Sequence, residues 1–306
     1  MCKNLIVERG VTTMDLMKVI LTKENLNQAY KKVVANKGAS GIDEITVEEL
    51  GSYIRENQET IINSLRNRTY FPKPVRRVYI PKANGKKRPL GIPTALDRTI
   101  QQAIAQPITD IYEKIFSEYS YGFRPNRSCH DAIRQALEYL NSGYEWVIDI
   151  DIEQFFDKVN HDKLIQILRE QVNDSDVLNL IRKYLRAGVM EKGIIKATKT
   201  GVPQGGPISV ILSNVYLKVN ATKSKVGRPM RTKYLGFTFL KNGGQWKVKP
   251  TNEKKANLYQ VMREYLKRGK AIARPLADTI RRVNQIVRGW INYFRIGMMK
   301  QFMDKF

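Results

Sequence analysis

The spacing of apolar residues divides the chain into helical and extended stretches. Apolar positions recur every three or four residues over 23–36, 46–68, 97–116 and 276–294, which predicts amphipathic helices. Gly38 follows the first helix, and Thr46 with Glu49 has capping-box spacing at the start of the second. The apolar seam of the last helix consists of Leu276, Ile280, Val283, Val287, Trp290 and Phe294.

Three further stretches have the patterns of strands. Residues 71–93 predict a hairpin that turns at Asn84-Gly85, and residues 233–249 predict a second one that turns at Asn242-Gly243-Gly244. The stretch 145–157 alternates apolar and acidic residues, and we expect its apolar face to pack inward and its acidic face to point outward. The apolar face carries Ile148, Ile150 and Ile152, and the acidic face carries Asp149, Asp151 and Glu153.

The acidic face of this strand is a candidate metal site. Carboxylates two residues apart on a strand raise each other's pKa unless a cation lies between them. Mg²⁺ takes one or two such carboxylates and fills its shell with water and phosphate oxygens. The alternative interpretation is an ordinary solvated strand face.

Composition indicates a polyanionic partner. The chain has 306 residues, a net charge of +24 and a pI near 9.9. From Lys192 to Asn252 there are twelve Lys or Arg and no Asp or Glu. This distribution favours nucleic acid over an anionic membrane surface, because no long basic amphipathic helix accompanies it.

Other chemistry is less prominent in the sequence. The apolar runs are too short to cross a bilayer, no apolar leader follows Met1, and two cysteines make no disulfide framework, so we expect a cytoplasmic protein. His130 and His161 are far apart in sequence, and we interpret both as structural.

Basic side chains gather at several places that suit phosphate binding. The first hairpin is crowded with them, although a solubilising turn is the alternative. The loop 119–128 mixes aromatic residues with arginines, which suits base stacking, although its rings could equally be core anchors. The residues expected to contact nucleic acid are Arg76, Arg77, Lys86, Lys87, Arg124, Arg127, Lys223, Lys225, Arg281, Arg282 and Arg288.

Several stretches together resemble a group II intron reverse transcriptase, or maturase, of the retron-type reverse transcriptase family. The blocks that carry the resemblance are the hairpin 76–92, Ser120-Tyr121-Gly122-Phe123-Arg124-Pro125, the acidic strand 149–157, Gly201-Val202-Pro203-Gln204-Gly205-Gly206, Lys233-Tyr234-Leu235-Gly236-Phe237 and Arg288-Gly289-Trp290-Ile291-Asn292-Tyr293-Phe294. The resemblance implies an α+β fold with the right-hand architecture of polymerases. Fingers would cover residues 1–92, an antiparallel palm 93–250 and a helical thumb 251–306.

The resemblance also implies roles for individual residues. Two Mg²⁺ ions would catalyse nucleotidyl transfer from deoxynucleotides onto a DNA primer along an RNA template. Asp151 and the Ile152 carbonyl would bind metal, and Asp149 would support them as a second catalytic carboxylate. The nucleotide-binding residues would be Lys82, Arg88, Phe156 (as a gate against ribonucleotides) and Gln204.

The sequence departs from the family in the palm. A Tyr-Ala-Asp-Asp turn, which supplies the second pair of metal ligands, should stand between the Pro-Gln-Gly block and the Tyr-Leu-Gly-Phe block. No Asp-Asp pair occurs in this chain, so we predict an internal deletion near Leu217 and Lys218. We also expect the thumb to be truncated after Phe306.

Three interpretations of function follow. The chain is a reverse transcriptase by lineage with impaired polymerisation, rescued only if another chain supplies the lost segment. Alternatively it is a non-catalytic RNA-binding protein that assists splicing, or a decayed remnant. Its RNA and its oligomeric state are left open.

Overall fold

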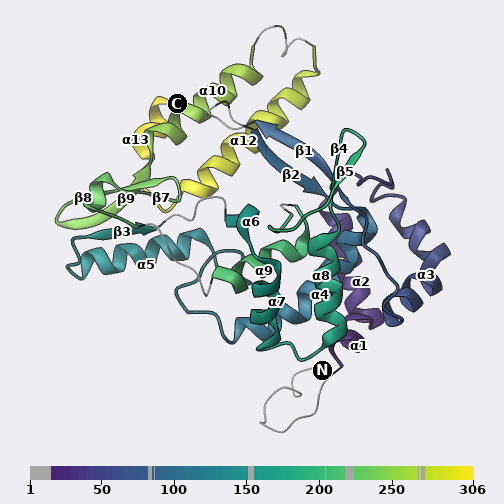
Figure 1. Cartoon of the computed structure of the whole chain (residues 1–306). Helices are drawn as coiled ribbons and strands as arrows, with labels where there is room; N and C mark the ends of the chain where they lie inside the picture. Colours follow the sequence, from purple (N-terminus) through teal and green to yellow (C-terminus); the bar gives the residue numbers. More distant parts are fainter. Residues whose placement is uncertain are drawn as a thin grey trace. The chain divides into compact units, whose positions relative to one another are not determined.

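The computed structural model describes residues 15–81, 85, 87–150, 155–203, 205–217, 224–267, 269 and 273–306. The fold is α+β, mostly helical with small sheets, which confirms the predicted class (Figure 1). Residues 1–117 with 152–221 form a first compact unit, and residues 118–151 with 222–306 form a second. Each unit is described by itself, and the right-hand arrangement and the boundaries at residues 92 and 250 stay predictions. Within the described ranges, no helix combines the length and the apolar character needed to cross a bilayer.

Helix α4 (Ala95–Glu113) is the centre of the first unit. It begins at the cap Thr94 and runs through Pro107, within a few residues of the predicted helix. Its Ile100, Ile104 and Ile108 are almost fully buried. The helices in contact with α4 are α1 (Leu16–Ile20), α2 (Lys23–Ala35), α3 (Leu50–Arg66) and α9 (Pro207–Leu217). Helix α7 (His161–Arg169) packs on α9 and on α8 (Ser175–Arg186).

A four-stranded sheet belongs to the same unit, in the order β2-β1-β4-β5. The predicted hairpin is confirmed as β1 (Val75–Pro81) and β2 (Lys87–Ile92), which pair antiparallel with Arg77 opposite Gly91. Strand β4 (Val189–Glu191) joins β1 in parallel, and β5 (Ile194–Lys196) forms the far edge. Most of the turn between β1 and β2, including Lys82 and Lys86, lies outside the described residues.

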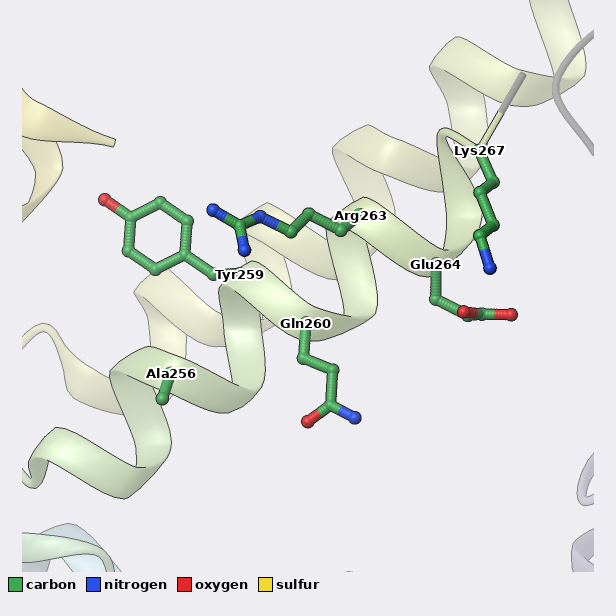
Figure 2. A pocket seen from close by; sticks show the side chains of 6 residues that line it. All are labelled: Ala256, Tyr259, Gln260, Arg263, Glu264 and Lys267. Carbon is green, nitrogen blue, oxygen red and sulfur yellow. The ribbon is translucent and has the colours of Figure 1, made fainter.

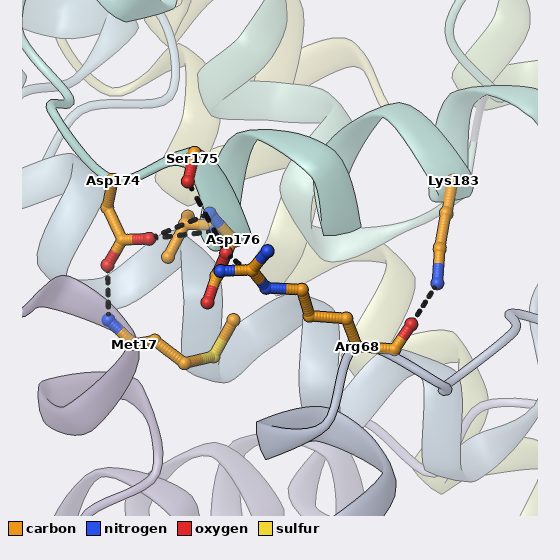
Figure 3. Close-up of polar contacts among 7 residues, drawn as sticks. Met17, Arg68, Asp174, Ser175, Asp176 and Lys183 are labelled. Atoms are coloured by element: carbon orange, nitrogen blue, oxygen red, sulfur yellow. Dashed lines mark hydrogen bonds and ion pairs between the residues drawn. The ribbon is translucent and has the colours of Figure 1, made fainter.

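Polar contacts from α8 position the segment that leads into β1 (Figure 3). Asp174 caps α8, and its other carboxylate oxygen accepts from the Met17 amide at 2.8 Å, which ties α1 to α8. Arg68 contacts Asp176 at 2.7 Å, and the Lys183 ammonium donates to the Arg68 carbonyl at 2.6 Å. These bonds fix the chain just before the β1–β2 hairpin.

A buried carboxylate, Asp97, holds the same segment to α4. Asp97 is 1% exposed and accepts from the Tyr70 hydroxyl at 2.7 Å, from the Thr94 hydroxyl at 2.8 Å and from the Lys73 amide at 3.2 Å. Burial raises the pKa of Asp97, although these three donors oppose the shift. The donors therefore satisfy a charge that the apolar surroundings disfavour.

The second unit has a smaller core. Helix α5 (Cys129–Asn141) packs on β9 (Gln245–Pro250), which pairs with β8 (Phe237–Asn242) as the second predicted hairpin. Helices α10 (Asn252–Tyr265) and α12 (Leu276–Phe294) contact each other, and α13 (Lys300–Lys305) follows. The core side chains are Ile133, Leu140, Phe237, Phe239, Val248 and Phe294.

Three sequence predictions were wrong in part, two of them in the second unit. The block at Tyr234 is not one strand, because Leu235 and Gly236, with φ of 50° and 81°, turn the chain between β7 (Lys233–Tyr234) and β8. In β3 (Val147–Ile150), Val147 packs on the core while Ile148, expected inside, is 61% exposed. The chain resumes beyond Asp151 and Ile152 as a short helix, α6 (Phe155–Lys158), where the pattern predicted the end of a strand.

The predicted seam of α12 holds only over the second half of the helix. Val283, Val287, Trp290 and Phe294 are at least partly buried, whereas Leu276 and Ile280 are 73% and 51% exposed. Thr279 is buried in their place. The apolar spacing identified the helix correctly, but it misplaced the buried face of the first two turns.

We expect Tyr70→Phe to lower the free energy of unfolding by about 1.5–3 kcal/mol at pH 7, the usual value of a hydrogen bond to a charged group. Because the pKa of Asp97 is raised above its unfolded value, its ionisation destabilises the fold as pH rises through the interval between the two values. The loss from Tyr70→Phe should therefore shrink as pH falls through the raised pKa of Asp97, because protonation removes the charged acceptor.

Urea denaturation at pH 7 and at pH 4 measures both effects, and a double-mutant cycle with Asp97→Asn is the control. If Tyr70→Phe costs as much in the Asp97→Asn background as in the wild type, the hydroxyl does not act through this carboxylate.

Candidate nucleotide and nucleic-acid site

Two of the predicted blocks meet through their main chains in the first unit. The Val202 amide donates to the Phe156 carbonyl at 2.7 Å, and the Gly201 amide donates to the Val159 carbonyl at 2.8 Å. Gly201 has φ of 88°, and a Cβ there would lie 2.9 Å from the Phe156 carbonyl oxygen. The half-buried Phe156 is thereby fixed against the Pro-Gln-Gly block, although the two stretches are more than forty residues apart.

The same block also lies against the hairpin. Gly205 has φ of 134°, and a Cβ at this position would overlap the carbonyl oxygen of Gly91 in β2. A Cβ at Gly206 would overlap the side-chain oxygen of Gln101. The two glycines therefore permit a backbone approach that no side chain allows. Three stretches singled out in the sequence, namely the hairpin, the turn at Phe156 and the Pro-Gln-Gly block, are thus brought together.

His161 supports this junction. It is 3% exposed, and its Nε2 hydrogen-bonds the Gly201 carbonyl oxygen at 2.7 Å. Asn160 caps α7 and forms an isolated bridge with Thr200. The structural interpretation of His161 agrees with these contacts, but no pattern in the sequence indicates that His161 anchors the glycine turn.

The basic residues of the hairpin differ in their surroundings. Arg76 is half-buried and donates to the Ser40 carbonyl at 2.6 Å, while Arg98 donates to the Ala39 carbonyl at 2.8 Å. Arg76 therefore acts as a positioning residue for the loop at Ser40. Arg77 is half-buried on β1, and Lys87 and Arg88 are exposed on β2.

Strands β1, β4 and β5 of the sheet share a further polar group. The Tyr79 hydroxyl donates to Glu191, and the Lys196 ammonium contacts the same carboxylate at 3.0 Å. These two donors, Tyr79 first, hold the pKa of Glu191 below its usual value. The sequence did not point to this link, because it joins strands more than a hundred residues apart.

In the aromatic and arginine loop of the second unit, both predicted arginines contact carbonyl groups of the loop itself or of the residue just before it. Arg124 is buried and donates to the Ser120 carbonyl at 3.1 Å. Arg127 donates to the Glu118 carbonyl, and its guanidinium lies 5.6 Å from the centre of the Tyr121 ring. Both arginines shape the loop, whereas Phe123 is exposed.

The acidic strand is described only in part. Strand β3 pairs antiparallel with β6 (Ser224–Gly227) in a two-stranded sheet, with Asp149 in register with Lys225. The predicted site residues Lys82, Lys86, Asp151, Ile152, Gln204 and Lys223 lie outside the described residues. Within the described ranges, no group of three or more His, Cys, Asp or Glu side chains is placed to hold a metal ion.

Helices α10 and α12 present basic side chains. Arg281, Arg282 and Arg288 are exposed, and Arg281 contacts Asp278 at 3.2 Å. Arg263 on α10 and Lys267, two residues past the end of that helix, border a shallow pocket of about 430 Å³ together with Ala256, Tyr259, Gln260 and Glu264 (Figure 2). Arg263 and Lys267 are not among the predicted site residues, because a mixed run of charges on a helix resembles an ordinary solvated face.

The sequence models of two protein families match parts of the chain. Residues 80–219 match "Reverse transcriptase (RNA-dependent DNA polymerase)", and residues 255–306 match "Group II intron, maturase-specific domain". The chain belongs to the group II intron reverse transcriptase and maturase family.

Curated relatives extend the comparison. The group II intron-encoded protein LtrA of Lactococcus lactis subsp. cremoris is 40% identical over 205 residues, which is 66% of this chain and 34% of LtrA. Protein YkfC of Escherichia coli (strain K12) is 39% identical over 208 residues, which is 66% of this chain and 55% of YkfC. The chain therefore spans about a third to a half of these relatives.

Among solved structures, a chain of a partial Cas6-RT-Cas1–Cas2 complex is similar to this one. The TM-score is 0.46 with 20% sequence identity, over 86% of this chain and 45% of the other.

We expect Gly205→Ala to destabilise the first unit by about 2–5 kcal/mol, because it adds a strained φ to an overlap with the β2 backbone. Gly243→Ala is the matched control, since Gly243 also has a positive φ but has open space where its Cβ would stand. Gly243→Ala should lower the free energy of unfolding by about 1–2 kcal/mol, which is the cost of the positive φ alone. Thermal unfolding of both variants tests the difference, and equal costs would mean that the Gly205–Gly91 approach adds nothing.

Proposed function

We propose that this chain binds intron RNA and that the nucleotidyl transfer of its family is impaired in it. The charge distribution carries the proposal. The net charge is +24, yet Lys192 to Asn252 contains no carboxylate side chain. Binding RNA requires many positive charges near phosphates, whereas two-metal catalysis requires carboxylates at fixed positions. This sequence has the positive charges that RNA binding requires, but it lacks one of the two aspartate pairs that two-metal catalysis requires.

Exposed cations on both units support RNA binding. Lys87 and Arg88 lie on β2, and Arg281, Arg282 and Arg288 lie on α12 within the maturase-specific match. Each cation that neutralises a phosphate releases a counterion, so the affinity would fall steeply with salt. Intron RNA is the partner that the maturase-specific match favours.

The carboxylates do not fit a two-metal site. Asp149 and Asp151 could support one Mg²⁺ ion, but the second aspartate pair of the family is absent from the sequence. The reverse transcriptase match ends at residue 219, two residues beyond the deletion that we infer at Leu217 and Lys218.

The pairing of β6 with β3 adds structural support. Strand β6 is the first element described after the inferred junction, and it pairs directly with the strand of Asp149. Lys225, a basic residue, stands at the register position opposite Asp149.

The remaining residues keep the roles that their family assigns. Lys82 and Arg88 would hold a triphosphate, Phe156 would contact the sugar and Gln204 would line the nucleotide pocket. The main-chain bonds between Phe156 and Val202 support a preserved nucleotide pocket. A non-catalytic protein that assists splicing is the second candidate function, and the missing carboxylates together with the maturase-specific match favour it.

Primer extension on an RNA template with Mg²⁺ and deoxynucleotides tests the proposal, beside Asp151→Asn and an RNA-binding titration. We expect no extension above the Asp151→Asn background and RNA binding that weakens as salt rises, with similar affinity for both proteins. Extension that disappears in Asp151→Asn would contradict the loss of catalysis. Absence of RNA binding would contradict the proposed function itself.

A further inference from the structure

The loop before α5 contains two consecutive turns with different chemistry. The second turn has Pro125 and then Asn126 with φ of 58°, and the Arg127 amide donates to the Arg124 carbonyl at 3.4 Å. Proline followed by asparagine is the ordinary choice for such a turn. The first turn has Gly122 and then Phe123, and it is Phe123 that has the positive φ, 57°. Glycine therefore precedes the position that would need it.

A positive φ is unfavourable for a bulky side chain, because Cβ crowds the backbone. Among the described residues, Leu235 is the other bulky apolar residue with a positive φ. Its conformation belongs to a two-residue hairpin turn, and its carbonyl accepts from the Tyr293 hydroxyl at 2.9 Å. Leu235 thus has a structural reason for the strain.

Phe123 gains no burial in return. Its side chain is 75% exposed. Phe71 is equally exposed, but the Lys183 ammonium lies 4.2 Å from the centre of its ring. In the part of the chain that the structure describes, Phe123 has no ring or cation partner of this kind. A strained and uncovered ring is better explained by a ligand than by folding.

The frame around Phe123 is held firmly. Arg124 is buried on the Ser120 carbonyl, and Arg127 covers Tyr121. The Tyr119 ring lies 6.3 Å from that of Tyr139, and the hydrogen bond between them, with one to Glu118, raises the pKa of Tyr119 to about 12. The neighbouring aromatic residues are therefore engaged within the protein, and Phe123 is the ring that the loop presents.

We propose that the Phe123 ring stacks on an unpaired base of bound single-stranded RNA. The inference rests on the proposed function, since it specifies a contact of the RNA. Base stacking uses a flat and exposed aromatic face, accepts any base and requires that the base is not paired. The strongly positive chain brings the polyanion near, and the fixed ring adds a contact that salt does not weaken.

The test compares single-stranded RNA with a duplex of the same sequence. We expect Phe123→Ala to weaken single-strand binding by about 5- to 150-fold, which corresponds to one stacked base. Binding of the duplex and the salt slope on the single strand should not change, because the lost contact involves an unpaired base and no charge. Phe123→Trp should retain single-strand binding. The wild type should quench the fluorescence of a 2-aminopurine base placed in the single strand, and Phe123→Ala should quench it less.

A second variant separates ligand binding from folding. Phe123→Asn places a residue that tolerates positive φ at the strained position, so its Tm should equal or exceed that of the wild type while single-strand affinity falls. Asn126→Gly, in the adjacent turn, is the matched control and should change neither quantity substantially.

Each contrary result has a distinct meaning. A lower Tm for Phe123→Asn, equal losses on single strand and duplex, or no loss for Phe123→Ala would each overturn the stacking role while RNA binding stands. A wild type that binds no RNA would overturn the proposed function as well.

Discussion

The first unit depends on a close approach of three backbone segments that only glycine permits. At Gly201 the chain lies against the carbonyl of Phe156, and at Gly205 it lies against that of Gly91, so any side chain would separate the segments. Because the contacts are made by the main chain, they fix distances that flexible side chains could not. The Pro-Gln-Gly block is therefore a structural junction as well as a candidate ligand site. Two buried polar groups reinforce the elements on either side. The Nε2 of His161 hydrogen-bonds the Gly201 carbonyl oxygen, and the Asp97 carboxylate accepts from hydroxyl and backbone donors.

The two requirements of a polymerase can be lost separately. Attraction of RNA depends on the sum of many charges, and losing one segment of the palm changes that sum little. Catalysis depends on a few carboxylates held within a fraction of an ångström, so the loss of one short segment removes it. A deletion that spares the basic hairpin and α12 can therefore leave binding intact. The β3–β6 pairing indicates how such a chain closes its sheet, since the segment after the junction becomes the partner of the acidic strand.

Local rules explain what could be predicted from sequence. The capping box between Thr46 and Glu49, the hairpin at Asn242-Gly243 and the amphipathic α4 all follow from interactions between residues near one another in the chain. The exposed face of β3 and the first turns of α12 could not be predicted this way, because the alternation shows two faces but not what packs on each. The partners of long side chains could not be predicted either, because a local pattern does not show which distant groups lie nearby. Arg76 and Arg124 looked like phosphate ligands, yet their partners are carbonyls of the protein itself. In the candidate site, the structure shows contacts among the Phe156 turn, the hairpin and the Pro-Gln-Gly block. The roles of the individual site residues, including Asp151, stay predictions.

Backbone strain distinguishes residues that stabilise the fold from residues that bind a ligand better than exposure alone does. Exposed aromatic residues are common, and Phe71 shows that a cation from the protein can cover such a ring. A strained backbone at a bulky residue persists only when something compensates for it. At Leu235 the compensation is visible as a tight turn and a bond from Tyr293. At Phe123 the described residues supply none, and the proposed RNA ligand would supply it. An unpaired base is the partner consistent with a flat ring, a rigid frame and a net charge of +24.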